Sequence, residues 1–211
     1  CYQHALRSGA DYVLPGASER EAIILIDRLT GNQPEPSAIP TQLDDYPYPA
    51  RDLRHAREYA VILTSHGCPY RCTYCASFLL YKAFTQRDPL RVADEIEYFH
   101  QRYGIVDFAF YDDALLVHAD AHISVTLDEV ARRGLRCRFH TPNGLHARFI
   151  TPQLAERMYS AGFKTIRLGL ETVSARRQWE TGNKVESKHV WAAIHALREA
   201  GFSSEQIGVY I

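Results

Sequence analysis

The sequence predicts an α/β fold in which parallel strands and helices alternate to form part of a barrel. From Tyr59 onward, short apolar runs lead into amphipathic stretches of about 12 to 17 residues, the pattern typical of βα units. A glycine a few residues before each following strand marks the end of each helix. Because βα crossovers are right-handed, successive units of this kind curl into a barrel or part of one.

The boundaries of these elements follow from start and stop signals. Asp88-Pro89 and Thr151-Pro152 open two helices as N-cap and first helical residue. We expect strands at 59–64, 105–111, 136–141, 164–170 and 206–211, and helices at 88–103, 119–133, 151–161 and 187–200, which Gly104, Gly134, Gly162 and Gly201 terminate.

The chain before Tyr59 has a different character. Residues 1–33 predict a helix, a short strand at Asp11-Tyr12-Val13-Leu14, a turn at Pro15-Gly16 and a second helix that ends at Gly31. Residues 34–58 are rich in proline and predict an extended linker. The expected organisation is therefore an N-terminal piece (1–33), a linker (34–58) and a βα core (59–211).

Composition narrows the class of protein. Hydrophobic residues make up 46% and charged residues 23% of the 211 residues, so we expect a sizeable core. The formal charge of −1 provides no field that would attract nucleic acid or an anionic membrane, and neither is expected as a partner. The chain contains no apolar run of about 18 residues that would span a bilayer.

The two ends of the sequence predict a fragment. The chain begins at Cys1 without a methionine and stops inside the fifth predicted strand. A sheet cut at that strand exposes an edge, so we expect the isolated chain to be poorly soluble or inactive.

Three cysteines carry the strongest functional signal. Cys68, Cys72 and Cys75 have the spacing C-x3-C-x2-C and directly follow the first predicted strand. Three thiolates on one loop can hold three irons of a [4Fe–4S] cluster and leave the fourth iron open for a small molecule. Exposed clusters and free thiols suit a reducing compartment, which indicates the cytoplasm.

Zinc is the main alternative for these cysteines. A structural zinc site usually has four ligands in two pairs, whereas this chain has one triplet. His66 or His140 would have to supply the fourth ligand. Cys1 and Cys137 lie far off in sequence and are expected to be ordinary thiols. A non-catalytic zinc or iron–sulfur module therefore remains the rival interpretation.

The cysteine run resembles the cluster motif CxxxCxΦC of the radical S-adenosylmethionine (SAM) enzymes, with Tyr74 as the aromatic residue Φ. The resemblance implies a partial barrel with the cluster on the loop after its first strand. It also implies that the open iron binds SAM, which is cleaved reductively to a 5′-deoxyadenosyl radical. The implied partners are a small-molecule substrate and an electron donor such as flavodoxin or ferredoxin.

The N-terminal part resembles a particular subgroup of this family. Gly9-Ala10-Asp11-Tyr12-Val13-Leu14-Pro15-Gly16 and the linker from Leu43 to Leu53 are similar to members in which a cobalamin-binding Rossmann-like domain precedes the barrel. The resemblance implies methylation or rearrangement as the reaction. The chain has no D-x-H-x-x-G loop, and Asp120-Ala121-His122 matches only its first half, so cobalamin in the full-length protein is implied by the resemblance alone.

The resemblance also implies a set of residues that bind SAM. Tyr74 is expected to pack against the adenine, and Asp112 or Asp113, at the end of the second strand, to receive the ammonium group. The family often has a Gly-Gly-Glu-like stretch at that strand end, and Tyr111-Asp112-Asp113 departs from it. Strand-end positions facing the ribose and carboxylate are occupied by Asn143, Arg148, Arg167 and Glu171.

A second enzyme of the same family is the remaining alternative. A methylthiotransferase-like protein acting on tRNA or ribosomal protein would usually carry a further N-terminal cysteine set and a basic RNA-binding module. The near-neutral charge and the lone Cys1 give that interpretation little support.

Overall fold

The computed structural model describes residues 2–33, 39–53 and 58–211. Five strands form one sheet in the order β1-β4-β5-β6-β7, and each neighbouring pair is parallel. Their bounds are β1 Tyr59–Ile62, β4 Asp107–Phe110, β5 Arg138–His140, β6 Phe163–Gly169 and β7 Ile207–Tyr210. The predicted α/β fold with a partial parallel barrel is confirmed.

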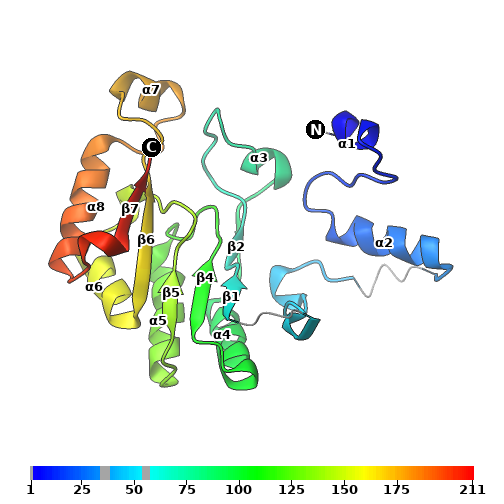
Figure 1. The fold of residues 1–211 in the computed structure, drawn as a ribbon, viewed down its shortest axis with the longest axis horizontal. Helices are drawn as coiled ribbons and strands as arrows, with labels where there is room; N and C mark the ends of the chain where they lie inside the picture. Colours follow the sequence, from blue (N-terminus) through cyan, green and yellow to red (C-terminus); the bar gives the residue numbers. More distant parts are fainter. Residues whose placement is uncertain (1, 34–38, 54–57) are drawn as a thin grey trace.

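Four helices connect these strands and cover one face of the sheet (Figure 1). They are α4 Pro89–Tyr103, α5 Ile123–Arg132, α6 Pro152–Ala161 and α8 Ser187–Glu199, and each packs against the next. Asp88 accepts a hydrogen bond from the Leu90 amide at 2.7 Å, and Thr151 accepts one from the Leu154 amide at 3.1 Å, so both predicted N-caps are confirmed.

Two of the predicted helix ends show why glycine is needed there. Gly104 and Gly162 have φ of 67° and 97°, and each donates its amide to the last turn of its helix. The helix predicted from residue 119 begins later, at Ile123. Residues Ala119–Ala121 form a 3₁₀ turn, and His122, with φ of −127° and ψ of −85°, separates this turn from the helix.

The core lies between the sheet and the helices. Phe108, Phe110, Phe139 and Phe163 are each at most 1% exposed, and neighbouring rings stand 5.3–6.2 Å apart. Because side chains alternate along a strand, the residues between these phenylalanines face the opposite, helix-free side. Asp107 and His140 lie there and bond to each other at 3.0 Å.

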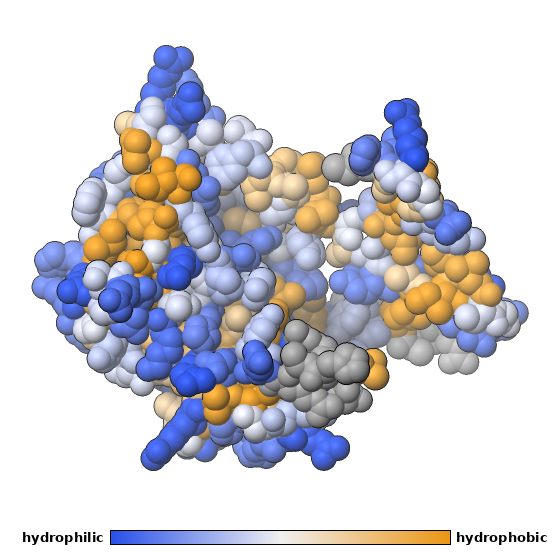
Figure 2. Space-filling model, in the orientation of Figure 1, coloured by the Kyte–Doolittle hydropathy of each residue, from blue (hydrophilic) through white to orange (hydrophobic). Residues whose placement is uncertain are grey.

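The N-terminal part lies beside the sheet and not within it (Figure 1). It contains α1 Tyr2–Arg7 and α2 Glu19–Thr30, and the strand predicted at 11–14 is wrong. A strand needs a hydrogen-bonded neighbour, and residues 11–14 have none in the described part of the chain. No residue of α2 is buried, and hydrophobic side chains gather on this lobe (Figure 2).

Four more 3₁₀ turns lie in the connections of the described chain: Leu43–Asp45, Arg51–Leu53, Ala147–Phe149 and Ser204–Gln206. The first two fall in the predicted linker. Within the described ranges, no helix combines the length and the apolar character needed to cross a membrane.

Candidate iron–sulfur and SAM site

The cysteine loop leaves the sheet at the carboxyl end of β1. A short antiparallel pair, β2 Ser65–His66 and β3 Thr85–Gln86, forms its base, and α3 Ser77–Leu80 lies within it. Figure 1 shows α3 and α7 (Ala175–Glu180) beyond the carboxyl ends of the strands. The loop therefore lies at the edge of the sheet where parallel α/β proteins place their chemistry.

The three predicted cluster ligands share this one loop. Cys72 is buried, Cys68 and Cys75 are half-buried, and all three are free thiols. The Cys75 amide donates to the Cys72 carbonyl at 3.0 Å, and the Ser77 amide donates to the Cys75 sulfur at 3.4 Å. Amide donors to sulfur stabilise thiolates and tune the potential of iron–sulfur clusters.

The thiols also interact with one another electrostatically. Burial raises the pKa of Cys68, and Cys72, Asp113 and Cys75 add to that increase, while the Tyr70 amide opposes it. Holding several thiolates side by side therefore needs a positive centre between them. Metal ions supply this charge and deprotonate their thiol ligands.

The donor set suits an iron–sulfur cluster. Three free thiols share one loop, and an amide donates to one of the three sulfurs. Thiolates are the usual ligands of [4Fe–4S] clusters, and three of them leave one iron open for another ligand.

The loop is braced by the connection that follows β6. The Thr73 amide donates to the Thr181 carbonyl at 3.3 Å. Gly182 has a φ of 108°, and a Cβ there would lie 3.4 Å from the Cys72 Cα. Backbone thus packs directly against the buried cysteine, and the turn after α7 shapes the cluster loop.

The two predicted carboxylates differ in their surroundings. Asp112 is 4% exposed, and its Oδ1 accepts hydrogen bonds from the Thr64 amide (2.9 Å), the Thr64 hydroxyl (2.8 Å) and the Ser65 hydroxyl (2.6 Å). Burial raises the pKa of Asp112 to about 6, although these donors oppose the increase. Asp113 is exposed and accepts from the Ser77 hydroxyl at 2.5 Å, beside the cysteines.

Asn143 and Arg167 lie in different places relative to this edge. Asn143 Nδ2 donates to the carbonyls of Tyr111 (2.7 Å) and Asp112 (3.4 Å), so it joins the end of β5 to the end of β4. Arg167 lies over Gly208 and donates to the carbonyls of Ile166 and Gln206. Its guanidinium is therefore directed toward the amino end of β7, away from the cysteines.

Glu171 follows β6 with a φ of 67°, a conformation that costs free energy for any residue with a side chain. Two amides, those of Leu170 and Glu171, donate to the Tyr210 carbonyl at 3.0 Å and hold this bend. Strain of this kind is typical of functional positions. It places the Glu171 carboxylate within 3.2 Å of Lys184 Nζ.

Lys184 is a candidate site residue that the sequence did not reveal. Its side chain is 12% exposed, and its ammonium lies 5.9 Å from the Tyr74 ring centroid. Burial raises the pKa of Tyr74, and a neighbouring charge and hydrogen bond at Cys72 add to that increase. Lys184 thus connects Glu171 to the aromatic residue between the cysteines. No motif marked it, since it lies in the irregular turn between α7 and α8.

Two histidines border the loop. His66 is half-buried, its ring centroid lies 4.9 Å from that of Tyr81, and burial lowers its pKa. His146 is 4% exposed and meets Tyr70 edge-on at 5.1 Å. Burial, with Lys184 and Arg148 nearby, lowers the pKa of His146 to about 3, so it is neutral. Arg148, predicted as a SAM contact, has its guanidinium carbon 5.9 Å from the centroid of the Tyr70 ring.

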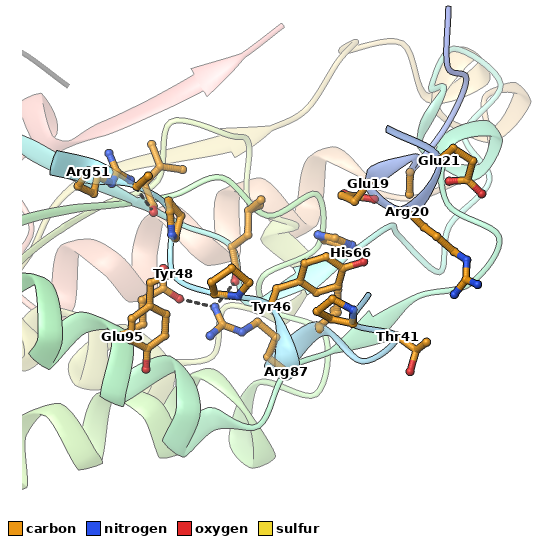
Figure 3. A pocket seen from close by; sticks show the side chains of 18 residues that line it. Glu19, Arg20, Glu21, Thr41, Tyr46, Tyr48, Arg51, His66, Arg87 and Glu95 are labelled. Atoms are coloured by element: carbon orange, nitrogen blue, oxygen red, sulfur yellow. Dashed lines mark hydrogen bonds and ion pairs between the residues drawn. The ribbon is translucent and has the colours of Figure 1, made fainter. Parts of the chain in front are cut away.

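An open cavity lies beside this site. It has a volume of about 820 Å³ between α2, the linker and the outer side of β1, and Figure 3 shows the side chains around it. His66, one residue before the cysteine loop, lies on its wall near Tyr46. The cavity does not include the cysteines or the strand ends, so it is distinct from the predicted SAM site.

The fold and this loop define a class of enzyme: a partial parallel barrel with an iron–sulfur cluster site after its first strand. The chain belongs to the Radical SAM superfamily, whose family model matches residues 62–211. Enzymes of this family use a [4Fe–4S] cluster and SAM, as the cysteine spacing predicted.

Curated relatives point the same way. "Uncharacterized methyltransferase PH0819" of Pyrococcus horikoshii is 28% identical over 178 residues, which are 81% of this chain and 38% of that protein. "Hopanoid C-3 methylase" of Methylococcus capsulatus is 23% identical over 185 residues, 83% of this chain and 35% of that protein. The chain spans little more than a third of the length of these two relatives.

Solved structures confirm the fold. The cobalamin-dependent radical SAM enzyme OxsB, with aqua-cobalamin bound, matches with a TM-score of 0.73 at 16% identity, over 98% of this chain and 34% of that chain. The radical SAM methyltransferase TsrM from Kitasatospora setae matches with a TM-score of 0.62 at 22% identity, over 72% of this chain and 30% of that chain. At these identities the likeness shows a shared fold, which extends in OxsB over nearly the whole of this chain.

Proposed function

We propose that this chain is the core of an enzyme that binds a [4Fe–4S] cluster and SAM and methylates a small-molecule substrate, with rearrangement as the other reaction expected of the subgroup. The observation that carries the proposal is the placement of three free thiols on one loop beside the polar ends of β4, β5 and β6. When bound, such a cluster supplies an electron for the reductive cleavage of SAM.

Cys68, Cys72 and Cys75 would hold the cluster. The amide of Ser77 would donate to the sulfur of Cys75, and the turn at Gly182 would keep solvent from Cys72. The rival zinc module is disfavoured by the strained, polar strand ends, which a structural site does not need.

The SAM contacts are assigned by burial and charge. Asp113 suits the ammonium group, because it is exposed beside the cysteines whereas Asp112 is buried and engaged by Thr64 and Ser65. Lys184 suits the carboxylate, since Arg167 is directed elsewhere.

The remaining SAM contacts suit the nucleoside. Glu171 has one oxygen bonded to Lys184, so its second oxygen suits a ribose hydroxyl. Asn143 uses its amide nitrogen on two carbonyls, which leaves its oxygen as an acceptor toward the site. Tyr74, half-exposed between two cysteines, suits the adenine.

Methylation is supported by the names of relatives. Two curated relatives are named as a methyltransferase and a methylase, and the solved structure of TsrM is that of a methyltransferase. Cobalamin is proposed for the full-length protein, with residues 1–33 as the end of its binding domain and 34–58 as the linker, because OxsB matches nearly this whole chain. A flavodoxin or ferredoxin as electron donor and a cytoplasmic location complete the proposal.

The test is anaerobic reconstitution with iron and sulfide, followed by EPR of the dithionite-reduced protein with and without SAM. A reduced [4Fe–4S] signal that changes on addition of SAM is expected, because SAM would bind the open iron. Protein that takes up zinc and gives no cluster signal, or a cluster indifferent to SAM, would contradict the proposal.

A further inference from the structure

The base of the cysteine loop is held by very little backbone. The cysteine loop comprises residues 67–84. It begins after β2 and ends at β3, and these two strands pair over two residues each. So short a ladder is only marginally stable by itself. Contacts made by side chains must therefore hold the loop in place. Several of these contacts are made by Arg87, which directly follows β3.

Arg87 joins the loop base to three other parts of the chain. Its Nε donates to Asp44 of the linker at 3.1 Å, and its Nη1 donates to Glu95 of α4 at 2.5 Å and to the Leu63 carbonyl at 3.0 Å. Figure 3 shows the Arg87–Glu95 pair at the wall of the cavity. The Arg87 amide also donates to the Thr64 carbonyl at 2.9 Å.

This ion pair is largely removed from water. The Arg87 and Glu95 side chains are 12% and 4% exposed. Burial raises the pKa of Glu95, and the Arg87 guanidinium opposes that increase. Burial also opposes the charge of Arg87, but Glu95 and Asp44 outweigh it and raise its pKa. Each of the two side chains therefore keeps its charge because the other lies beside it, and the two stay in contact.

The segment before the barrel touches the loop at two further points. Asp44 Oδ2 accepts from the Asp88 amide at 2.7 Å, next to Arg87. The Ala17 amide, just before α2, donates to the Leu80 carbonyl at the end of α3 at 3.3 Å. The cysteine loop is therefore fastened to the N-terminal part and not only to the barrel.

We propose that Arg87 is a positioning residue for the cysteine loop. It holds the return strand against the linker and α4, and so sets where Cys68, Cys72 and Cys75 stand. This inference rests on the proposed function, since the placement matters through the cluster. Asp44 is the partner through which the linker takes part.

The helix layer offers a matched control. Arg133 bonds to Asp94 (2.8 Å), Glu97 (2.7 Å) and Glu129 (2.7 Å), and its side chain is 15% exposed. Its exposed fraction is close to the 12% of Arg87, and it has three acidic partners where Arg87 has two. These partners join α5 to α4, and none of them belongs to the loop.

The experiment compares four proteins. They are the wild type, Asp44→Asn, Arg87→Met combined with Glu95→Gln (so that no lone carboxylate stays buried), and Arg133→Met. Amide hydrogen exchange of residues 67–84 is measured in the apo protein. Iron and sulfide retained after reconstitution and desalting are measured separately.

We expect faster exchange in the loop and roughly tenfold weaker iron retention for the Arg87 variant, the lower end of what supporting residues of metal sites cost. Asp44→Asn should change both readouts in the same direction, and Arg133→Met should change neither. Wild-type behaviour of the Asp44 and Arg87 variants, or equal losses in Arg133→Met, would overturn the inference. If the double variant does not fold, Asp44→Asn decides.

The experiment distinguishes a failure of the proposed function from a failure of the positioning role of Arg87. Wild-type protein that retains no cluster contradicts the proposed function, and hydrogen exchange then decides alone whether Arg87 orders the loop. Wild-type protein that retains a cluster equally well in the Asp44 and Arg87 variants contradicts only the positioning role.

Discussion

Lys184 lies between Glu171 and Tyr74. These two contacts join residues that are far apart in the sequence, which is why the sequence revealed only part of the candidate site. The cysteines were predictable because cluster ligation imposes a spacing within one loop. Lys184 and Glu171 are 13 residues apart and meet only through the turn after α7. The roles of Asp112 and Asp113 could not be separated in sequence, since burial of one of them depends on Thr64 and Ser65 of a distant strand end.

Replacing a cluster ligand should abolish iron binding. For Cys72→Ser we expect almost no retained iron after reconstitution, because two thiolates cannot hold three irons. The control is Cys137→Ala, which removes a thiol that is buried far from the loop and whose pKa burial raises to about 12. Iron analysis of both proteins checks this, and equal iron content in the two would count against the cysteine assignment.

Replacing Lys184 should weaken SAM binding. Loss of a partly buried charge contact costs roughly 1.5–3 kcal/mol, so Lys184→Met is expected to raise the dissociation constant of SAM about tenfold or more. Lys188→Met removes an exposed lysine, 71% accessible, from a surface ion pair and should leave binding unchanged. Anaerobic calorimetry on the reconstituted proteins would reveal the difference, and identical affinities would argue against Lys184.

Asp112 should make stability depend on pH. Its pKa is about 6 in the folded protein and about 3.9 in an unfolded chain, so folding favours the neutral carboxyl. That contribution is complete below pH ~4 and is lost as the pH rises through about 6. Relative to Asp112→Asn, the apo wild type should lose roughly 1–3 kcal/mol between pH 4 and pH 7. Urea unfolding at several pH values measures this, and parallel curves for the two proteins would refute it.

At the scale of elements, the regular part of the chain was predictable and the irregular part was not. Helix starts at Asp88 and Thr151 and ends at Gly104 and Gly162 carry local signals, and the structure has each of them. The supposed strand at 11–14 had the right residue types, but a strand forms only when a neighbour supplies hydrogen bonds. The 3₁₀ turns of the linker depend on contacts with the barrel that no local pattern encodes.

The two helix-ending glycines should differ in their tolerance of alanine. A Cβ at Gly104 would meet nothing within 4 Å, whereas one at Gly162 would lie 2.7 Å from the Cys137 carbonyl oxygen. Gly104→Ala should cost about 1–2 kcal/mol for the left-handed conformation alone. Gly162→Ala should cost more, because backbone must also shift. Urea unfolding compares them, and equal losses would mean that the close approach is unimportant.

At the scale of the whole molecule, the N-terminal lobe presents apolar side chains that the barrel does not cover. Ile26 and Leu29 of α2 are each 58% exposed, and the lobe stands apart in Figure 2. Patches of this kind promote association in water. The lobe nevertheless contacts the cysteine loop through Ala17. One side of the lobe is therefore attached to the loop, and another side exposes apolar side chains to solvent.

The apolar face of α2 should cause this chain to self-associate. For Ile26→Gln combined with Leu29→Gln we expect a smaller rise of apparent mass with concentration, since less apolar surface is exposed. Arg28→Gln, on the same helix, changes a polar residue and should leave association as it is. Light scattering over a concentration series distinguishes them, and equal association in all variants would exclude this face.

The outer edge of β1 has a consequence for how the sheet can be extended. The carbonyls of Tyr59, Val61 and Leu63 point away from β4, and guanidinium groups occupy all three: Arg51 donates to the first two and Arg87 to the third. A strand paired with β1 at this edge would extend the hydrogen-bond ladder of the sheet, because it would present its own carbonyls to the next strand. The arginine side chains donate hydrogen bonds to β1 but present no carbonyls, so the ladder ends with them. Growth of this sheet is therefore directional: an incoming strand, whether from this chain or another, can add only beside β7.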